Sequence, residues 1–201
     1  MGKGDGDKDR GNHSVKPYTV MVMRHAGSHL IKPLMRRLTG QALYSPKGDD
    51  ALIRDPSGKV VVFLRDPRDR AVSGYRYKAG RRGQDVSDVG LARFLSRKPK
   101  GGITPIEFMQ AWGQRWNNYP GAMVMRFEDL VRDAAERKAQ VDRLAGYVGC
   151  GDPADAIAYA FETSRTFTGR YSSWPEWFGP LATKAWHDGG GARAVKAMGY
   201  K

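Results

Sequence analysis

Three short apolar runs, each followed by the signals of a helix start, constrain the fold of this chain more than any other feature. The runs are Tyr18–Met23, Lys59–Leu64 and Ala122–Arg126, and they are rich in Val, Met and Phe. Nearly uninterrupted apolar runs of this length are typical of strands buried on both faces. Because strands alternate with helices, the chain is expected to form an α/β domain with a central, mostly parallel sheet.

The helix signals after the first two runs are local and specific. Apolar residues recur at helical spacing over Ser28–Leu38, and Gly40 is placed to end that helix. After the second run, Asp66 as N-cap and Pro67 at the first helical position predict a helix running towards Lys78. Both strands are therefore expected to lead directly into helices.

The middle of the chain combines one clear helix with one stretch of loop composition. The motif Thr104-Pro-Ile-Glu107 is a capping box, and the helix that it opens carries Trp112 and Trp116 on one apolar stripe, which favours a core position. In contrast, Gly80–Gly102 is rich in Gly, Arg and Lys. Its composition predicts a long mobile loop with a short helix near Leu91–Leu95.

Charge narrows the class of partner. The chain has 34 Lys and Arg against 21 Asp and Glu, a formal net charge of +13. This balance favours an anionic partner: a nucleotide, a nucleic acid, an anionic membrane surface, or a sulfated or carboxylated polymer. Charge alone does not choose among them.

The ends of the chain and its cysteine content suggest the compartment. Residues Met1–Lys16 contain almost nothing apolar and predict a disordered tail, which leaves residues 17–201 as one domain. Cys150 is the only cysteine, so no disulfide within the chain can form. No apolar run approaches the roughly 18 residues that span a bilayer, and the N-terminus lacks the apolar core of a signal peptide. We therefore expect a soluble, cytoplasmic protein.

The first predicted strand is followed by Arg24-His25-Ala26-Gly27-Ser28-His29, called here the first loop. A glycine turn that leads into a helix N-terminus points backbone N–H groups and the positive end of the helix dipole at an anion. The Gly-Lys-Ser/Thr of a Walker A motif is absent. Taken alone, the pattern also fits an ordinary turn between a strand and a helix.

The second predicted strand is followed by the second loop, which begins at Arg65 and continues into the next helix. An unpaired guanidinium at the end of a buried strand would be costly, and an anion bound by two hydrogen bonds is a natural partner. Ser73 lies two turns into the helix and can face the same ligand. The alternative is a capped helix with a surface cluster of Arg and Asp.

These residues resemble a known family. Val61–Tyr75 resembles the 3′-phosphate-binding motif of the sulfotransferases that use 3′-phosphoadenosine-5′-phosphosulfate (PAPS), and Arg24–His29 is similar to the 5′-phosphosulfate loop of that family. Arg126–Leu130 resembles an element that follows a strand in the same family. Phe167–Trp174 and Met198–Tyr200 resemble its C-terminal cofactor loop and its closing segment. The matches occur in the family's order along the chain.

The resemblance implies a P-loop-type, three-layer α/β domain with a sulfotransferase-like fold. The implied activity is transfer of a sulfuryl group from PAPS to a hydroxyl or amine acceptor, with adenosine 3′,5′-bisphosphate as product. No metal is implied, and the four His and one Cys show no zinc-type spacing. The implied cofactor-binding residues are Arg65, Ser73, Gly169 and Arg170 for the 3′-phosphate, and Gly27, Ser28 and the backbone of Ala26 for the 5′-phosphosulfate.

The first loop departs from the family pattern at the position where the family has a catalytic lysine. His25 occupies that position, so either Arg24 or an imidazolium form of His25 is expected to take over the lysine's role. The favoured general base is His29, because the positive end of a helix dipole favours the neutral, basic form of an imidazole. Asp49 and Asp50, between the two loops, are the fallback.

Two other classes of function compete with the sulfotransferase assignment. One is a P-loop kinase or other nucleotide phosphotransferase, against which the missing Walker lysine speaks. The other is a non-catalytic basic module that binds nucleic acid or an acidic polymer. It would use the basic strip Arg81, Arg82, Arg93, Arg97, Lys98 and Lys100. In a sulfotransferase no nucleic-acid partner is expected, and the same strip can recruit an anionic acceptor among small molecules or saccharides. The sequence names neither the acceptor nor the oligomeric state.

Overall fold

The computed structural model describes residues 18–46, 52, 55–56, 58–84, 86–100, 102–164 and 173–201. Within these residues the sheet has three parallel strands, β1 (Tyr18–Val22), β2 (Lys59–Leu64) and β3 (Met123–Arg126), in the order β1-β2-β3. The predicted parallel sheet and the central place of the second strand are therefore confirmed. The tail predicted for Met1–Lys16 lies outside the described residues.

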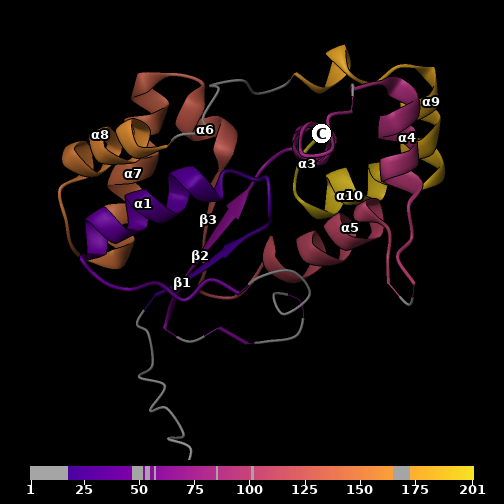
Figure 1. Cartoon of the computed structure of the whole chain (residues 1–201). Coiled ribbons are helices and arrows are strands. Elements are labelled where there is room, and N and C mark those ends of the chain that lie inside the picture. The colour runs from indigo at the N-terminus through magenta and orange to yellow at the C-terminus, as the bar shows by residue number, and fades with distance from the viewer. Residues whose placement is uncertain are drawn as a thin grey trace, which may run out of the picture.

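Helices cover both faces of this sheet and form a three-layer arrangement (Figure 1). On one side lie α1, α7 and α8, and on the other lie α3, α5 and α10, with α4 and α9 packed together beyond them (Figure 1). The described helices are α1 (Ser28–Thr39), α3 (Pro67–Gly80), α4 (Asp88–Ser96), α5 (Pro105–Trp116), α6 (Phe127–Val131), α7 (Ala134–Val148), α8 (Pro153–Thr163), α9 (Pro180–Asp188) and α10 (Gly191–Ala197), with a 3-10 turn at Trp174–Glu176.

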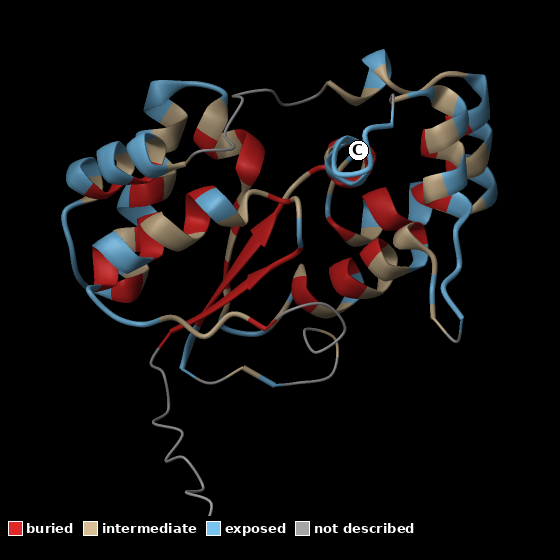
Figure 2. Ribbon diagram, viewed as in Figure 1, coloured by how far each residue is buried: buried red, intermediate tan, exposed pale blue. Residues whose placement is uncertain are grey.

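The core lies between these layers. Figure 2 shows β1 and most of β2 buried along their length and the helices buried on the sides that face them, whereas buried and partly buried residues alternate in β3. Trp112 and Trp116 of α5 are fully buried, which confirms their predicted core position. Among the described residues, every helix is too short or too polar to span a bilayer.

Helix α1 begins and ends at glycines, as the sequence predicts. Gly27 is its N-cap with φ 96°, and Gly40 is its C-cap with φ 62°. Both values fall in the left-handed region that glycine adopts without a steric penalty. Apolar residues of α1 at the predicted helical spacing, from Leu30 to Leu38, are buried against the sheet and helix α8.

Helix α3 also follows its predicted start. The carboxylate of Asp66 accepts a hydrogen bond from the backbone N–H of Arg68 at 2.8 Å, and Pro67 occupies the first helical position. Because Arg65 immediately precedes this cap, the cap fixes the direction in which the chain leaves the sheet. The second loop is therefore anchored at the carboxyl end of β2.

The short helix predicted near Leu91–Leu95, within the stretch Gly80–Gly102 that was otherwise predicted as a long mobile loop, is confirmed. Helix α4 occupies Asp88–Ser96, longer than the short helix expected there, and packs against α9. The carboxylate of Asp88 accepts hydrogen bonds from the backbone N–H groups of Leu181 and Ala182 at the start of α9, at 3.0 and 2.8 Å. Contacts with residues more than 90 positions away thus stabilise a segment whose composition resembles that of a loop.

Candidate active site

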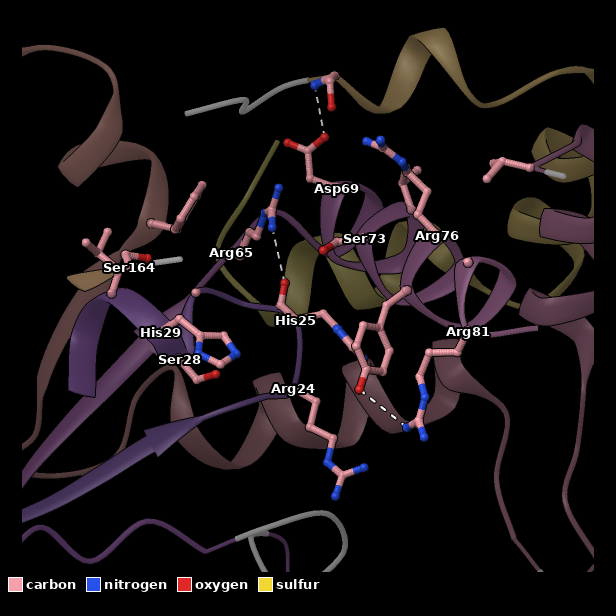
Figure 3. A pocket seen from close by; sticks show the side chains of 18 of the residues that line it. Arg24, His25, Ser28, His29, Arg65, Asp69, Ser73, Arg76, Arg81 and Ser164 are labelled. Atoms are coloured by element: carbon pink, nitrogen blue, oxygen red, sulfur yellow. Dashed lines mark hydrogen bonds between the residues drawn. The ribbon is translucent and has the colours of Figure 1, made fainter. Parts of the chain in front are cut away.

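Both candidate loops line one pocket at the carboxyl ends of β1 and β2 (Figure 3). The pocket has a volume of about 830 Å³. It brings together the predicted site residues Arg24, His25, Gly27, Ser28, His29, Arg65 and Ser73. Because β1 and β2 are hydrogen-bonded neighbours in a parallel pair, the loops that follow them emerge at the same edge of the sheet.

Three predicted site residues are not among those that line the pocket. Ala26 is fully buried, and its backbone N–H donates to the carbonyl oxygen of Met23 at 3.2 Å, so this N–H serves the turn itself. Gly169 and Arg170 lie outside the described residues.

Gly27 is the residue on which the shape of the first loop depends. A Cβ atom at this position would lie 2.7 Å from Cδ2 of Phe127 and 2.9 Å from Cε1 of Phe63, closer than van der Waals contact allows. The carbonyl oxygen of Gly27 accepts the N–H groups of Leu30 and Ile31. The N–H groups that precede these in α1, including that of Ser28, therefore project beyond the helix end, where an anion can accept them.

The side chain of His25, in the first loop, packs against helix α3. Its backbone has φ 66°, which is unusual for a residue other than glycine. Its ring centroid lies 5.1 Å from that of Tyr77. Gly74 provides the space for this ring, because a Cβ at Gly74 would lie 3.2 Å from Cδ2 of His25.

Burial and nearby positive charges keep His25 neutral in the protein without ligand. Burial is the largest cause, and the charges of Arg70, Lys78, Arg24 and Arg65 add to it, so that the pKa of His25 falls to about 4. At pH 7 its imidazole therefore has one N–H donor and no charge. An imidazolium that replaces the family's lysine is not the form present in the unliganded protein.

Arg65, the first residue of the second loop, contacts the first loop through its side chain. Its Nη1 donates a hydrogen bond to the carbonyl oxygen of His25 at 3.2 Å, and its guanidinium lies over the ring of Phe127, 4.6 Å from the ring centroid (Figure 3). Burial lowers the pKa of Arg65, while Asp69 and Glu128 act in the opposite direction. Ser73 lines the same pocket from helix α3, as its spacing from Arg65 predicts.

Sequence reasoning missed Arg70, a second arginine that supports the first loop. Arg70 is buried in helix α3, and its Nε donates to the carbonyl oxygen of Arg24 at 3.2 Å. Burial lowers the pKa of Arg70 to about 10, so the guanidinium stays charged at pH 7. Arg65 and Arg70 thus bind consecutive backbone carbonyls of the first loop. No local pattern distinguishes Arg70 from Arg68 and Arg76, its neighbours along the same helix.

Asp69 connects the pocket to the C-terminal part of the chain. Its Oδ1 accepts the backbone N–H groups of Ser173 and Trp174 at 2.9 and 2.8 Å. The guanidinium of Arg68 lies 4.6 Å from the ring centroid of Trp174, and this contact reinforces the same attachment. The start of helix α3 therefore fixes the segment at Ser173 on the rim of the pocket (Figure 3).

A second long-range connection supports the N-cap of α3. The side chain of Glu128 accepts the backbone N–H of Asp66 at 2.9 Å and the hydroxyl of Tyr200 at 2.7 Å. Burial raises the pKa of Glu128, and burial together with Glu128 raises the pKa of Tyr200. The segments Arg126–Leu130 and Met198–Tyr200, both noted in the sequence, thus meet behind the second loop.

His29 is exposed and lines the pocket next to Ser28 (Figure 3). Among the described residues that line the pocket, Asp69 carries the one carboxylate, and this carboxylate binds the backbone of Ser173 and Trp174. Asp55, which also lies between the two loops in the sequence, forms an exposed ion pair with Arg115, at 2.9 Å. The fallback bases Asp49 and Asp50 lie outside the described residues.

Comparison with known proteins identifies the class of this site. Residues 48–165 match the family model described as the sulfotransferase domain, which covers more than half of the chain. The chain belongs to this family, and the identification made from its motifs is confirmed. The matched range includes the second loop but begins after the first, so the family model does not cover the first loop.

Solved structures support the same fold. A crystal structure of mouse sulfotransferase SULT7A1 complexed with PAP superimposes with a TM-score of 0.61 at 12% sequence identity, and the match covers 88% of this chain and 83% of that one. No curated protein sequence matches the chain. The three-layer sulfotransferase-like fold predicted from the sequence is thus confirmed, and the chain is an enzyme of the sulfotransferase class.

Proposed function

We propose that this enzyme takes PAPS as donor and transfers its sulfuryl group to a hydroxyl or amine group of an acceptor. The observation that carries the proposal is that Arg65 and Ser73 line the same pocket as Gly27 and Ser28. One nucleotide with an anionic group at each end can contact both sets of residues. The mouse enzyme of the same fold is complexed with PAP, the product of such a donor, which supports this choice.

Each loop has the chemistry for one end of the donor. The guanidinium of Arg65 and the hydroxyl of Ser73 would bind the 3′-phosphate by charge-assisted hydrogen bonds. The N–H groups at the start of α1 and the hydroxyl of Ser28 would bind the 5′-phosphosulfate, where the helix dipole also favours negative charge. Gly169 and Arg170 remain part of the proposal on the resemblance alone.

The transfer itself needs positioning and stabilisation of charge. The acceptor oxygen or nitrogen attacks sulfur in line, and the bond from sulfur to the bridging oxygen of the 5′-phosphate breaks with its electron pair left on that oxygen. The N–H groups of α1 stabilise this developing charge, together with Arg24 and the neutral N–H of His25. His29 accepts the proton that leaves the acceptor.

The position of Lys59 counts against a P-loop kinase. Lys59 stands at the amino end of β2, whereas the pocket lies at the carboxyl ends of the strands. Its Nζ donates to the carbonyl oxygens of Tyr147 and Val148 at 2.8 and 3.1 Å. This lysine is therefore bound at the end of α7 and does not reach a phosphate in the pocket.

A thermal-shift titration with adenosine 3′,5′-bisphosphate tests donor binding. At a hundredfold excess over Kd, binding stabilises the wild type by about 2.7 kcal/mol. For a chain of this size, this corresponds to a rise in Tm of roughly 5–10 °C. We expect Arg65→Ala and Ser73→Ala to reduce the shift, and Arg143→Ala, an exposed change on α7, to leave it intact. Equal shifts with adenosine 5′-monophosphate, which lacks the 3′-phosphate, would contradict the assignment of Arg65 and Ser73.

A further inference from the structure

One side of the pocket carries more positive charge than the proposed donor contacts use. Arg24 and Arg81 lie on one side of His25, whereas Asp69 lies on the other (Figure 3). The exposed cations Arg24, Lys78, Arg81, Arg82 and Arg97 are called here the basic rim. They come from the first loop, the C-terminal end of α3 with the turn after it, and the residue that follows α4.

Electrostatic interactions show that the basic rim is one cluster in space. After burial, the largest influences that lower the pKa of Lys78 are the positive charges of Arg70, Arg97, Arg82 and Arg24. Arg81 lines the same pocket as Arg24, and its Nη1 donates to the hydroxyl of Tyr77, another lining residue, at 3.4 Å. Residues more than 70 positions apart in the sequence thus face one another beside the first loop.

The basic rim has no neutralising carboxylate within the described part of the chain. No ion pair joins any of its five members to an Asp or Glu there. The nearby pair Lys98–Glu107, with 4.0 Å between the charged atoms, does not include a member of the rim. Like charges gathered without counter-charges repel one another, and an anionic ligand removes that repulsion.

The donor does not account for this charge. In the proposed function its two anionic ends are bound by Arg65 with Ser73 and by the N-terminus of α1, and Arg24 is the one member of the basic rim that also acts on the donor. Lys78, Arg82 and Arg97 do not line the pocket itself, so they lie outside the donor site. A second anion is therefore expected next to the first loop, where the acceptor must lie to reach sulfur.

We propose that the acceptor is an anionic saccharide whose carboxylate or sulfate groups bind the basic rim while one of its hydroxyls faces the first loop. This inference rests on the proposed function. Arg24 directly precedes His25 in the chain, so the bound anion lies close to the hydroxyl that accepts the sulfuryl group. A sugar carries both groups on the same ring or on adjacent rings, whereas in an acidic peptide the ring of tyrosine separates its hydroxyl from the carboxylates.

The test compares two saccharides that differ only at their carboxylate positions, so that one is anionic and the other neutral. The probes are an unsulfated hexasaccharide of alternating glucuronate and N-acetylglucosamine and the same hexasaccharide with its carboxylates reduced to alcohols. Binding is measured by calorimetry on the protein saturated with adenosine 3′,5′-bisphosphate. We expect the uronate form to bind at least tenfold more tightly than the reduced form, and its affinity to fall steeply with added salt.

Variants locate the interaction. The double variant Arg82→Gln/Arg97→Gln should weaken binding of the uronate form about tenfold and leave the affinity for adenosine 3′,5′-bisphosphate unchanged. The matched control Arg132→Gln/Arg143→Gln removes two exposed arginines from around helix α7 and should change neither affinity. In turnover assays with labelled donor, the rim variant should raise KM for the uronate acceptor and leave KM for the donor unchanged.

Several outcomes would overturn the inference. Equal binding of the charged and reduced saccharides would do so, as would an unchanged affinity in the rim variant. Preferential binding or sulfation of an acidic tyrosine peptide over the uronate form would assign the rim to a peptide instead. Failure of the wild type to bind adenosine 3′,5′-bisphosphate would refute the proposed function and this inference together, whereas nucleotide binding without saccharide selectivity refutes this inference alone.

Discussion

Nη1 of Arg65 donates a hydrogen bond to the backbone carbonyl oxygen of His25, at 3.2 Å. The residue proposed to bind one end of the donor therefore also supports the loop proposed to bind the other end. Nε of Arg70 makes the same kind of bond to the carbonyl oxygen of Arg24. Hydrogen bonds from these two arginines thus connect the second loop and α3 to the first loop. Substitution of either arginine should therefore weaken the contacts at both ends of the nucleotide.

Arg70→Met should weaken nucleotide binding without unfolding the protein. The change removes the bond to the first loop, but it also removes a buried charge whose desolvation is costly, so the two effects on stability oppose each other. We expect the affinity for adenosine 3′,5′-bisphosphate, measured by calorimetry, to fall about tenfold, which corresponds to the ~1.4 kcal/mol of one charge-assisted hydrogen bond.

The matched control for Arg70 is Arg137→Met. Arg137 also donates from Nε to a backbone carbonyl, that of Leu130 at 2.7 Å, and its guanidinium also lies over an aromatic ring. Because Arg137 bonds to the carbonyl oxygen of Leu130 in α6 and not to the first loop, its loss should leave nucleotide affinity unchanged. If both variants weakened the affinity equally, the effect would be one of general stability and not of loop support.

Gly27→Ala should be strongly destabilising. The substitution combines a left-handed backbone conformation with a Cβ within 3 Å of the rings of Phe127 and Phe63. Backbone strain and overpacking together should lower the free energy of unfolding by about 2–5 kcal/mol, as measured by urea denaturation. Gly40→Ala separates the two effects, because Gly40 has φ 62° but a methyl group added there would have no atom within 4 Å. Gly40→Ala should lower the free energy of unfolding by only about 1–2 kcal/mol.

His25 should make stability fall in mild acid. The pKa of His25 is about 4 in the folded protein against a reference of 6.5, so the unfolded chain binds the extra proton first as pH falls. This contribution to stability is fully present above pH 6.5 and is lost progressively as pH falls towards 4. Thermal unfolding between pH 7 and 4.5 should show a weaker pH dependence in His25→Gln than in the wild type.

Nucleotide binding should bring the pKa of His25 back towards its ordinary value. An anionic group bound at the first loop favours the charged imidazolium, so adenosine 3′,5′-bisphosphate should raise the pKa of His25. A histidine titration followed by NMR, with and without the nucleotide, measures the change. An unchanged His25 resonance in the complex would show that the nucleotide does not contact the first loop.

His29→Ala should lower kcat and leave donor binding intact. Loss of a general base typically reduces the rate 10²- to 10⁴-fold. The control is His187→Ala, which removes an exposed imidazole from α9. A normal kcat in the His29 variant would exclude it as the base and leave positioning as the main source of catalysis.

The sequence predicted the parts of this molecule whose signals are local. The apolar run Lys59–Leu64 and the cap formed by Asp66 required no knowledge of the rest of the chain, and neither did the glycines that begin and end α1. Both loops could therefore be placed at the same edge of the sheet from the sequence alone. Their proximity follows from parallel pairing of β1 with β2.

The parts that could not be predicted depend on contacts between distant residues. Asp69 looks like an ordinary first-turn carboxylate, and only the fold shows that it binds the backbone N–H groups at Ser173 and Trp174. The sequence predicted only a short helix near Leu91–Leu95, and the full length of α4 depends on its packing against α9. The neutral state of His25 likewise follows from burial and from charges brought in by α3, which no local pattern reveals.

The fit of His25 against Gly74 has an evolutionary consequence. The ring of His25 fills the space that the missing Cβ leaves, with 3.2 Å between that ring and a methyl group placed at position 74. A methyl group at position 74 would require the imidazole of His25 to shift by a few tenths of an ångström, and a longer side chain would require a larger shift, so bulk at position 74 selects against the imidazole at position 25. Substitutions at these two positions should therefore be inherited as pairs among descendants of this gene.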